Sequence, residues 1–315
     1  MKKLKTKVLI FTSAFSLLLS DITFCQWNSQ KSVQAIKEHT LACNDSSINI
    51  IAHRGFSSIA LDNSQEAIDV CQDYSCIDGI EIDIRLTSDN NIVLNHNKSI
   101  KTENNKLLYI SEEKSTDLCK NKIKNNTFKR DLLSIKHLFD SDMGALKLQR
   151  KNIRNTKNAK LLKLDEFLSQ YHSSKELLID IKYNEDIEKF NEVLKELLKD
   201  RNDKNIILQS FDVDALVKLK KLLPQFQYQI ITNDEINIKK LKEEQINRVG
   251  LKYTLVNYKK IDQLRKEGFH VSIWTINSYS TFYKVSTELR EYYDDVTYIS
   301  NYPDCICYWV KQKKK

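Results

Sequence analysis

The sequence predicts an α/β fold, a (β/α)8 barrel of the TIM type, and three observations support this prediction. Short apolar runs typical of strands alternate with amphipathic stretches typical of helices, which is the pattern of a parallel sheet covered by helices. The 315 residues are sufficient for one barrel-sized domain. Polar and charged side chains follow or interrupt several of the apolar runs, as they do where barrels place active-site groups.

Nine runs have the composition and length of strands. They are residues 48–52, 79–86, 92–95, 177–181, 206–208, 228–231, 249–253, 270–274 and 296–299. Amphipathic stretches at 186–198, 213–223 and 259–267 are predicted helices between them. Only residues 88–91 separate the second and third runs, which is too short for a parallel crossover. The polar Ser-Asp-Asn-Asn sequence there predicts a hairpin, so the third run is the extra, antiparallel strand.

The remaining segments complete the predicted domain organisation. Residues 26–47 are a polar lead-in, residues 48–310 form the barrel domain, and residues 311–315 are a basic tail. Polar, Lys- and Asn-rich residues at about 100–160 read as an insertion over one mouth of the barrel. A composition of 41% hydrophobic and 29% charged residues excludes a disordered or collagenous chain.

Residues 1–25 are predicted to be a signal peptide. The first seven residues are basic, and residues 8–19 form an uncharged, mostly apolar run. That run has the length of a signal-peptide core and is too short to span a bilayer comfortably. Cleavage after Cys25 predicts a secreted or periplasmic protein. Two alternatives stay open, a lipid anchor on Cys25 and a retained membrane anchor.

Net charge and cysteine content further limit the function. The chain carries +8, and without residues 1–25, which hold four lysines and one aspartate, it carries +5. No nucleic-acid motif with interleaved aromatic residues is visible, although the basic tail leaves transient contact with an anionic membrane surface open. Removal of Cys25 leaves six of the seven cysteines. Export predicts disulfides among them, and their spacing does not match a zinc site.

The second strand carries the clearest chemical signal. Glu81, Asp83 and Arg85 alternate with isoleucines, so they share one face of the strand. In a barrel that face points into the lumen, where two carboxylates would repel each other unless a cation lay between them. Oxygen ligands of this kind suit Mg²⁺ or Ca²⁺, and Asp180 on the fourth strand could complete the site.

Basic side chains are expected beside these carboxylates. His53 and Arg54 follow the first strand directly, and Lys182 faces the same way as Asp180. Arg54 and Lys182 are natural contacts for a phosphate group. If the hairpin pairs Thr87 with Ile92, a second histidine, His96, lies opposite Asp83. The alternatives are a structural histidine at position 53 and a structural Lys–Asp ion pair.

Together these motifs resemble those of the glycerophosphodiester phosphodiesterases over roughly residues 48–305. The motifs, in order, are His53-Arg54-Gly55, Asn63-Ser64, Glu81-Ile82-Asp83, Thr87-Ser88-Asp89, His96-Asn97, Leu164-Asp165-Glu166, Asp180-Ile181-Lys182, Ser210-Phe211, Trp274-Thr275-Ile276-Asn277 and Ser300-Asn301-Tyr302-Pro303. The resemblance implies hydrolysis of a small-molecule glycerophosphodiester to glycerol 3-phosphate and an alcohol, with one divalent cation, Ca²⁺ or Mg²⁺. It implies these roles: Glu81, Asp83 and Asp180 as metal ligands; His53 and His96 as the acid–base pair; Arg54 and Lys182 as phosphate contacts; Trp274 in the substrate pocket.

Six residues at four places depart from the pattern of that family. The family usually has Glu at Asp180, Asp at Asn97, Thr-Asp at Ser300-Asn301 and Pro-Glu at Leu61-Asp62. An aspartate as third ligand also resembles the sphingomyelinase D relatives of this fold. Two other functions therefore stay open. One is a phospholipase D- or sphingomyelinase D-like enzyme that acts on intact lipids. The other is a non-catalytic phosphodiester-binding barrel.

Overall fold

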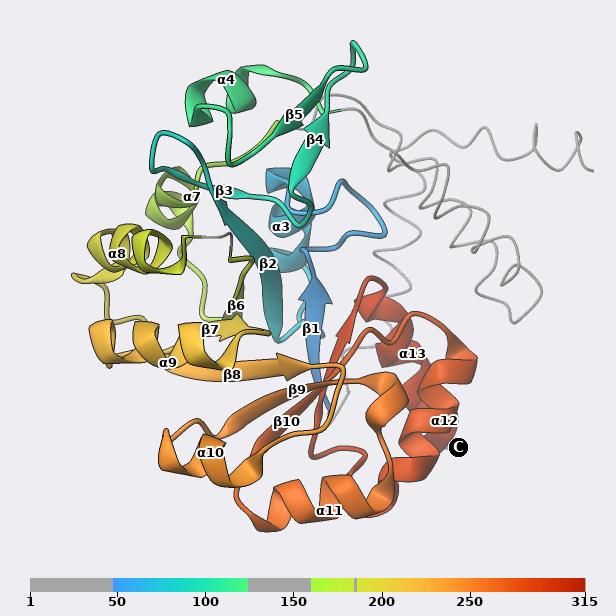
Figure 1. Cartoon of the computed structure of the whole chain (residues 1–315). Coiled ribbons are helices and arrows are strands. Elements are labelled where there is room, and N and C mark those ends of the chain that lie inside the picture. The colour runs from blue at the N-terminus through green and yellow to red at the C-terminus, as the bar shows by residue number, and fades with distance from the viewer. Residues whose placement is uncertain (1–47, 124–159, 184–185, 315) are drawn as a thin grey trace, which may run out of the picture.

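The computed structural model describes residues 48–123, 160–183 and 186–314, with the backbone alone for residues 308 and 311–314 (Figure 1). The predicted signal peptide at 1–25, the lead-in at 26–47 and most of the insertion lie outside the described residues. None of the described helices is long and apolar enough to cross a bilayer.

Eight parallel strands form a closed barrel, which confirms the predicted fold. The strands are β1 (Asn49–His53), β2 (Gly79–Leu86), β6 (Glu176–Ile181), β7 (Ile206–Ser210), β8 (Gln227–Thr232), β9 (Arg248–Lys252), β10 (His270–Trp274) and β11 (Thr297–Ser300). Their order is β1-β11-β10-β9-β8-β7-β6-β2, and pairing of β1 with β2 closes the ring. Each of these strands matches a predicted run to within one or two residues, so the alternating pattern located the whole barrel.

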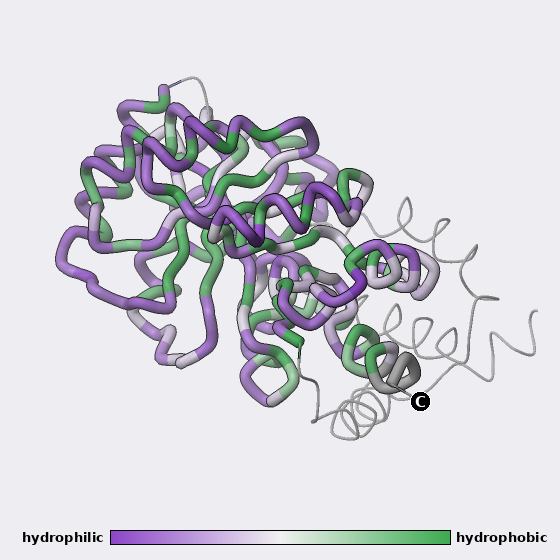
Figure 2. The backbone as a smooth tube through the Cα atoms, turned by 90° about the horizontal axis from the view of Figure 1, so that it is seen from below, coloured by the Kyte–Doolittle hydropathy of each residue, from purple (hydrophilic) through white to green (hydrophobic). Residues whose placement is uncertain are grey.

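Helices surround the barrel on its outer side (Figure 1). They are α3 (Gln65–Gln72), α7 (Leu164–Gln170), α8 (Ile187–Leu198), α9 (Val213–Leu222), α10 (Ile238–Glu243), α11 (Tyr258–Lys266), α12 (Tyr279–Leu289) and α13 (Pro303–Lys314), with short 3-10 turns at Tyr253–Leu255 and Arg290–Tyr292. In six of the α-helices a Ser, Asp or Asn side chain accepts a hydrogen bond from the first turn. The outer helices alternate hydrophilic and hydrophobic residues, as Figure 2 shows. Their apolar faces therefore pack on the sheet.

The two faces of β2 separate the core from the site. Ile80, Ile82 and Ile84 are fully buried among the residues of the main hydrophobic core. Glu81 and Asp83 belong to the opposite, lumen face. At the start of β2, a Cβ on Gly79 would lie 2.7 Å from the carbonyl oxygen of Glu176, so only glycine permits this close approach of strands.

The predicted hairpin after β2 is present, but its predicted register is wrong. Strand β3 (Ile92–Leu94) runs antiparallel to β2, with Leu86 opposite Ile92 and Ile84 opposite Leu94. The prediction had placed each partner one residue further along. The loop contains one more residue than expected, because both the amide and the hydroxyl of Thr87 donate to the carbonyl of Asn91. Asn90 supports this loop with a left-handed backbone, φ 57°.

The described part of the insertion lies beyond the carboxyl ends of the barrel strands (Figure 1). It contains a two-stranded antiparallel sheet of β4 (Ser99–Lys101) and β5 (Leu107–Tyr109), followed by α4 (Ser115–Lys120). These elements pack around a separate small core. Strands β4 and β5 were not predicted, because three-residue strands are too short to show an alternating pattern.

The expected disulfides are absent among the described residues. Cys71, Cys76, Cys119, Cys305 and Cys307 are not joined by disulfides, and Cys43 lies outside the described residues. Four of the five are buried, where a cysteine packs as a small apolar residue. The Cys307 Sγ donates a long hydrogen bond to the carbonyl of Cys76, 3.7 Å away.

Candidate active site

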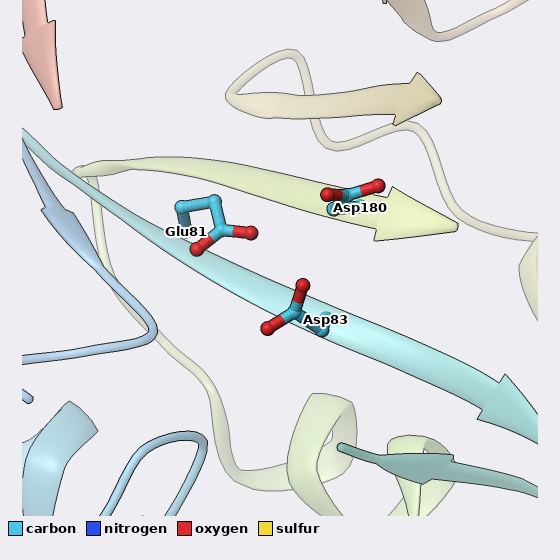
Figure 3. A group of neighbouring side chains, drawn as sticks. All are labelled: Glu81, Asp83 and Asp180. Atoms are coloured by element: carbon cyan, nitrogen blue, oxygen red, sulfur yellow. The ribbon is translucent and has the colours of Figure 1, made fainter. Parts of the chain in front are cut away.

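Three buried carboxylates meet in the barrel lumen. Glu81 and Asp83 come from β2, and Asp180 comes from β6, where it lies directly opposite Asp83. Figure 3 shows the three side chains on these neighbouring strands. One carboxylate oxygen from each residue lies within 4.8 Å of the other two. All three residues are buried, with at most 4% of the residue surface exposed. The predicted carboxylate cluster is therefore present.

The hydrogen bonding of these carboxylates fits a metal site. Asp83 Oδ1 and Asp180 Oδ1 are buried and accept no hydrogen bond. A buried carboxylate oxygen without a hydrogen bond is costly, even where, as for Asp83 Oδ1, an ammonium lies 3.2 Å away, and a hard cation with oxygen ligands would satisfy it. The donor set contains only carboxylates, which favours Mg²⁺ or Ca²⁺ over softer metals.

Burial and mutual repulsion shift the acidity of the cluster. Burial raises the pKa of Glu81 well above its usual value, and the nearby charges of Asp83 and Asp180 raise it further. Burial likewise raises the pKa of Asp180 to about 6. Burial would also raise the pKa of Asp83, but Arg54 and Lys182 outweigh it and lower that pKa. Asp83 is therefore the member of the cluster that stays ionised most firmly.

Arg54 and Lys182 lie against the cluster, as predicted. Arg54 Nε is 3.1 Å from Asp83 Oδ2, and its NH1 is 3.2 Å from Asp62 Oδ2. Lys182 Nζ pairs with Asp180 Oδ2 and lies 3.2 Å from Asp83 Oδ1. Both cations line the same cavity as Glu81 and Asp180. They can therefore bind an anion placed beside the cluster.

His53 ends β1 and points its two ring nitrogens at different partners. Its Nδ1 lies 2.6 Å from Asn301 Oδ1, and its Nε2 lies 3.8 Å from Glu81 Oε2. Burial and the positive charge of Arg54 lower the pKa of His53 to about 3. The imidazole is therefore neutral near neutral pH and can accept a proton from a reacting group.

His96 reaches the same cavity by a different route from the one predicted. Because β3 ends at Leu94, His96 lies beyond the strand rather than opposite Asp83. Its carbonyl accepts hydrogen bonds from Arg85 Nε and NH2, at 2.9 and 2.6 Å. Its ring Nδ1 lies 3.2 Å from Asn97 Oδ1. Burial lowers the pKa of His96 as well.

Aromatic side chains form the opposite wall of the cavity. Trp274 ends β10, as predicted, and its Nε1 donates to the carbonyl of Gly250 at 3.1 Å. Phe211, which follows β7, packs edge-to-face against Trp274 with ring centroids 5.5 Å apart. The cavity holds about 100 Å³. A larger cavity of about 610 Å³, between the barrel and the insertion, shares Lys182 with it.

The structure adds residues whose roles the sequence did not reveal. Asn63 donates a hydrogen bond to Asp83, and Asp62 forms an ion pair with Arg54. Asn301 contacts the His53 ring, and Phe211 lines the cavity. Asn63, Phe211 and Asn301 belong to motifs that the sequence showed, but a motif does not tell which partner each side chain contacts.

Comparison with known proteins agrees with this arrangement. A sequence model of the "Glycerophosphoryl diester phosphodiesterase family" matches residues 53–298. YhdW of Bacillus subtilis (strain 168), a provisionally named glycerophosphodiester phosphodiesterase, is 26% identical over 245 residues, which cover 75% of this chain and 89% of YhdW.

Solved structures show the same fold. A phosphodiesterase from Oleispira antarctica in complex with the product sn-glycerol-3-phosphate superposes with a TM-score of 0.62 at 20% identity, over 84% of this chain and 96% of its own. A glycerophosphodiester phosphodiesterase from Thermotoga maritima superposes with a TM-score of 0.58 at 21% identity, over 85% and 99%.

Proposed function

The chain belongs to the glycerophosphoryl diester phosphodiesterase family, and on that premise we propose that it hydrolyses glycerophosphodiesters to glycerol 3-phosphate and an alcohol by metal-assisted acid–base catalysis. The observation that carries the proposal is a cavity lined by two histidines, two cationic side chains and two carboxylates, with the third carboxylate, Asp83, in the same cluster. Such a set has the groups that a phosphodiester cleavage requires.

Glu81, Asp83 and Asp180 would hold one divalent cation, Ca²⁺ or Mg²⁺. Charge balance supports a divalent ion, since among the described residues these three carboxylates and Asp62 form ion pairs with two permanent cations, Arg54 and Lys182. When bound, the cation would neutralise phosphate oxygens and lower the pKa of the nucleophile, which is either water or a substrate hydroxyl group whose cyclic phosphate product water then opens.

Arg54 and Lys182 would bind the phosphate of the substrate. Both side chains are nearly buried, with 11% and 14% of their side-chain surface exposed, so their charges act in a medium of low polarity. They hold the diester beside the carboxylates and stabilise the negative charge on its oxygens.

His53 and His96 would transfer the protons. One imidazole removes the proton of the nucleophile, and the other protonates the departing alkoxide. The lowered pKa of both rings supports a neutral resting form, so the ring that acts as acid must take up a proton when the substrate binds. The phosphate charge would favour that protonation.

The substrate is proposed to be a small molecule with a glycerophosphate moiety. The product glycerol 3-phosphate in the complex of the Oleispira antarctica relative supports this class. Trp274 and Phe211 would contact its carbon atoms. The neighbouring cavity of about 610 Å³ offers room for the alcohol on the other side of the phosphate.

A second candidate is action on lipids with an acyl chain at a membrane surface. It is favoured by large apolar side chains that are exposed near the barrel mouth. They are Leu107, Tyr109, Phe211 and Tyr253, between 37% and 52% exposed. Such a rim suits transient contact with a lipid surface.

One assay tests the proposal and separates the two candidates. We expect the purified protein to cleave glycerophosphocholine, to lose that activity in excess chelator, and to regain it with Mg²⁺ or Ca²⁺. Lysophosphatidylcholine is the matched substrate that adds one acyl chain. Faster cleavage of lysophosphatidylcholine would favour the lipid candidate. Full activity in excess chelator would contradict the metal assignment.

A further inference from the structure

Asn63 makes a reciprocal pair of hydrogen bonds with Asp83. The backbone amide of Asp83 donates to Asn63 Oδ1, and Asn63 Nδ2 donates to Asp83 Oδ2, both at 2.9 Å. The orientation of the Asn63 amide is unambiguous, because a backbone N–H can only donate and must therefore face the amide oxygen. Asn63 is 4% exposed, so water does not compete for these bonds.

The position of Asn63 follows from the geometry of the sheet. Strand β1 ends at His53, which lies opposite Glu81, so β1 has no residue left to pair with Asp83. Asn63 occupies that place and supplies the acceptor that a strand would otherwise provide. Its left-handed backbone, φ 59°, and the bond from its own amide to the Arg54 carbonyl at 3.0 Å hold it there.

These bonds give the two oxygens of Asp83 different roles. Oδ2 receives both Asn63 Nδ2 and Arg54 Nε, at 2.9 and 3.1 Å. Oδ1 accepts no hydrogen bond and lies in the cluster with Glu81 and Asp180, 3.2 Å from the Lys182 ammonium. Asp83 Oδ1 is therefore placed to bind a cation, whereas Asp83 Oδ2 is bonded to other side chains of the protein.

We propose that Asn63 is a positioning residue for metal binding: its amide fixes the carboxylate of Asp83 so that Oδ1 alone serves the cation. The inference rests on the proposed metal site. Asn63 is not among the residues that line the cavity. It acts through Asp83, and partners that hold a metal ligand in this way affect cation affinity more than they affect the fold.

The test removes the amide without straining the backbone. Asn63→Gly suits it, because glycine adopts the left-handed conformation freely, whereas Asn63→Ala removes the same amide and adds strain. Asn205→Ala is the matched control. The Asn205 amide also makes two hydrogen bonds, to the carbonyls of Ser173 and Lys175 at 2.9 and 2.8 Å, but at the opposite end of the barrel.

Cation binding is measured by titration calorimetry with Mg²⁺ and with Ca²⁺ on the chelator-treated full chain, together with thermal unfolding in chelator. We expect both Asn63 variants to bind the cation roughly 10- to 100-fold more weakly than the parent protein. We expect Asn205→Ala to bind it normally. In the Asn63 variants, the deficit in kcat/KM for glycerophosphocholine should shrink as the cation concentration rises.

Two results would overturn the proposal. The first is an Asn63→Gly protein that folds and binds the cation as tightly as the parent. The second is an Asn63→Gly protein without cooperative unfolding in chelator, which would make Asn63 a residue of the fold. A parent protein that binds neither cation would instead refute the metal site itself, so the two failures are distinguishable.

Discussion

At the scale of single residues, the charged state of Lys182 depends on the carboxylates with which it forms ion pairs. Its ammonium pairs with Asp180 and Asp83, two of the three carboxylates that could hold a cation. Burial would lower the pKa of Lys182, but these carboxylates raise it, so the side chain stays charged. Removing Lys182 would leave the buried Asp180 carboxylate without its ion-pair partner.

The histidines carry the first prediction at this scale. We expect His53→Ala and His96→Ala each to lower turnover of glycerophosphocholine by roughly 10²- to 10⁴-fold, because each removes one proton transfer. A nitrophenyl phosphodiester needs little protonation of its leaving group. The variant that lacks the acid should therefore lose much less on that substrate, and the variant that lacks the base should lose equally on both.

The same experiment assigns the two roles. His53 has its Nδ1 directed at Asn301 and its Nε2 directed at Glu81, whereas His96 lies beyond the end of a strand. Steady-state kinetics on the two substrates are the measurement, and cation affinity is the control. Near-normal turnover in both variants would mean that the histidines are structural.

The raised pKa of Asp180 leads to a prediction of how cation affinity depends on pH. Burial raises its pKa to about 6, above the usual range of an aspartate. The protonated carboxyl group cannot bind the cation well, so a proton and the cation compete for it. We expect cation affinity to fall as the pH drops through about 6, and protonation of Glu81, whose pKa is also raised, to add to that loss. Titration calorimetry at several pH values, in buffers of different ionisation enthalpy, measures both the affinity and the protons released. An affinity that is constant from pH 5 to pH 8 would contradict this assignment.

At the scale of elements, the hairpin of β2 and β3 connects the carboxylates to His96. Arg85 extends from β2 and donates two hydrogen bonds to the carbonyl of His96. We expect Arg85→Met to leave the cation affinity intact but to lower kcat by roughly 10²-fold, because a small displacement of a catalytic group is costly. The measurement combines steady-state kinetics with cation titration.

Arg201→Met is the matched control for this prediction. Arg201 also donates to a backbone carbonyl, that of Leu168 at 3.2 Å, but it precedes β7 at the other end of the barrel. Equal kcat values in the two variants would show that Arg85 does not position His96.

The elements also show what could be predicted from the sequence and why. The bounds of β2 were predicted residue for residue, because Glu81 and Asp83 alternate with buried isoleucines and that alternation has only one structural meaning. The register of β3 was wrong because it depends on a left-handed Asn90 and on the bonds of Thr87, which leave no periodic signal. The contact of Asn63 with Asp83 joins residues 20 positions apart. Such a contact follows from the three-dimensional path of the loop and not from a local pattern.

At the scale of the whole molecule, the structure describes residues 48–123, 160–183 and 186–314, and the predicted signal peptide lies outside them. We propose that the chain is exported and that the mature protein begins after Cys25. Mass spectrometry of the protein isolated from its native host would then give the mass of residues 26–315. Recovery of the chain with residues 1–25 still attached and no lipid would contradict export by this leader.

One consequence of the barrel topology concerns how such a protein can diverge. The charged groups of the site come almost entirely from the ends of β1, β2 and β6, which are neighbours in the sheet. The loop after β7 and the end of β10 contribute mainly aromatic walls, through Phe211 and Trp274. Mutations in those loops and in the insertion can therefore reshape the cavity for a new alcohol without disturbing the reacting groups. Different parts of the chain therefore determine substrate preference and reaction chemistry. A protein descended from this one could acquire a new substrate and still catalyse the same reaction.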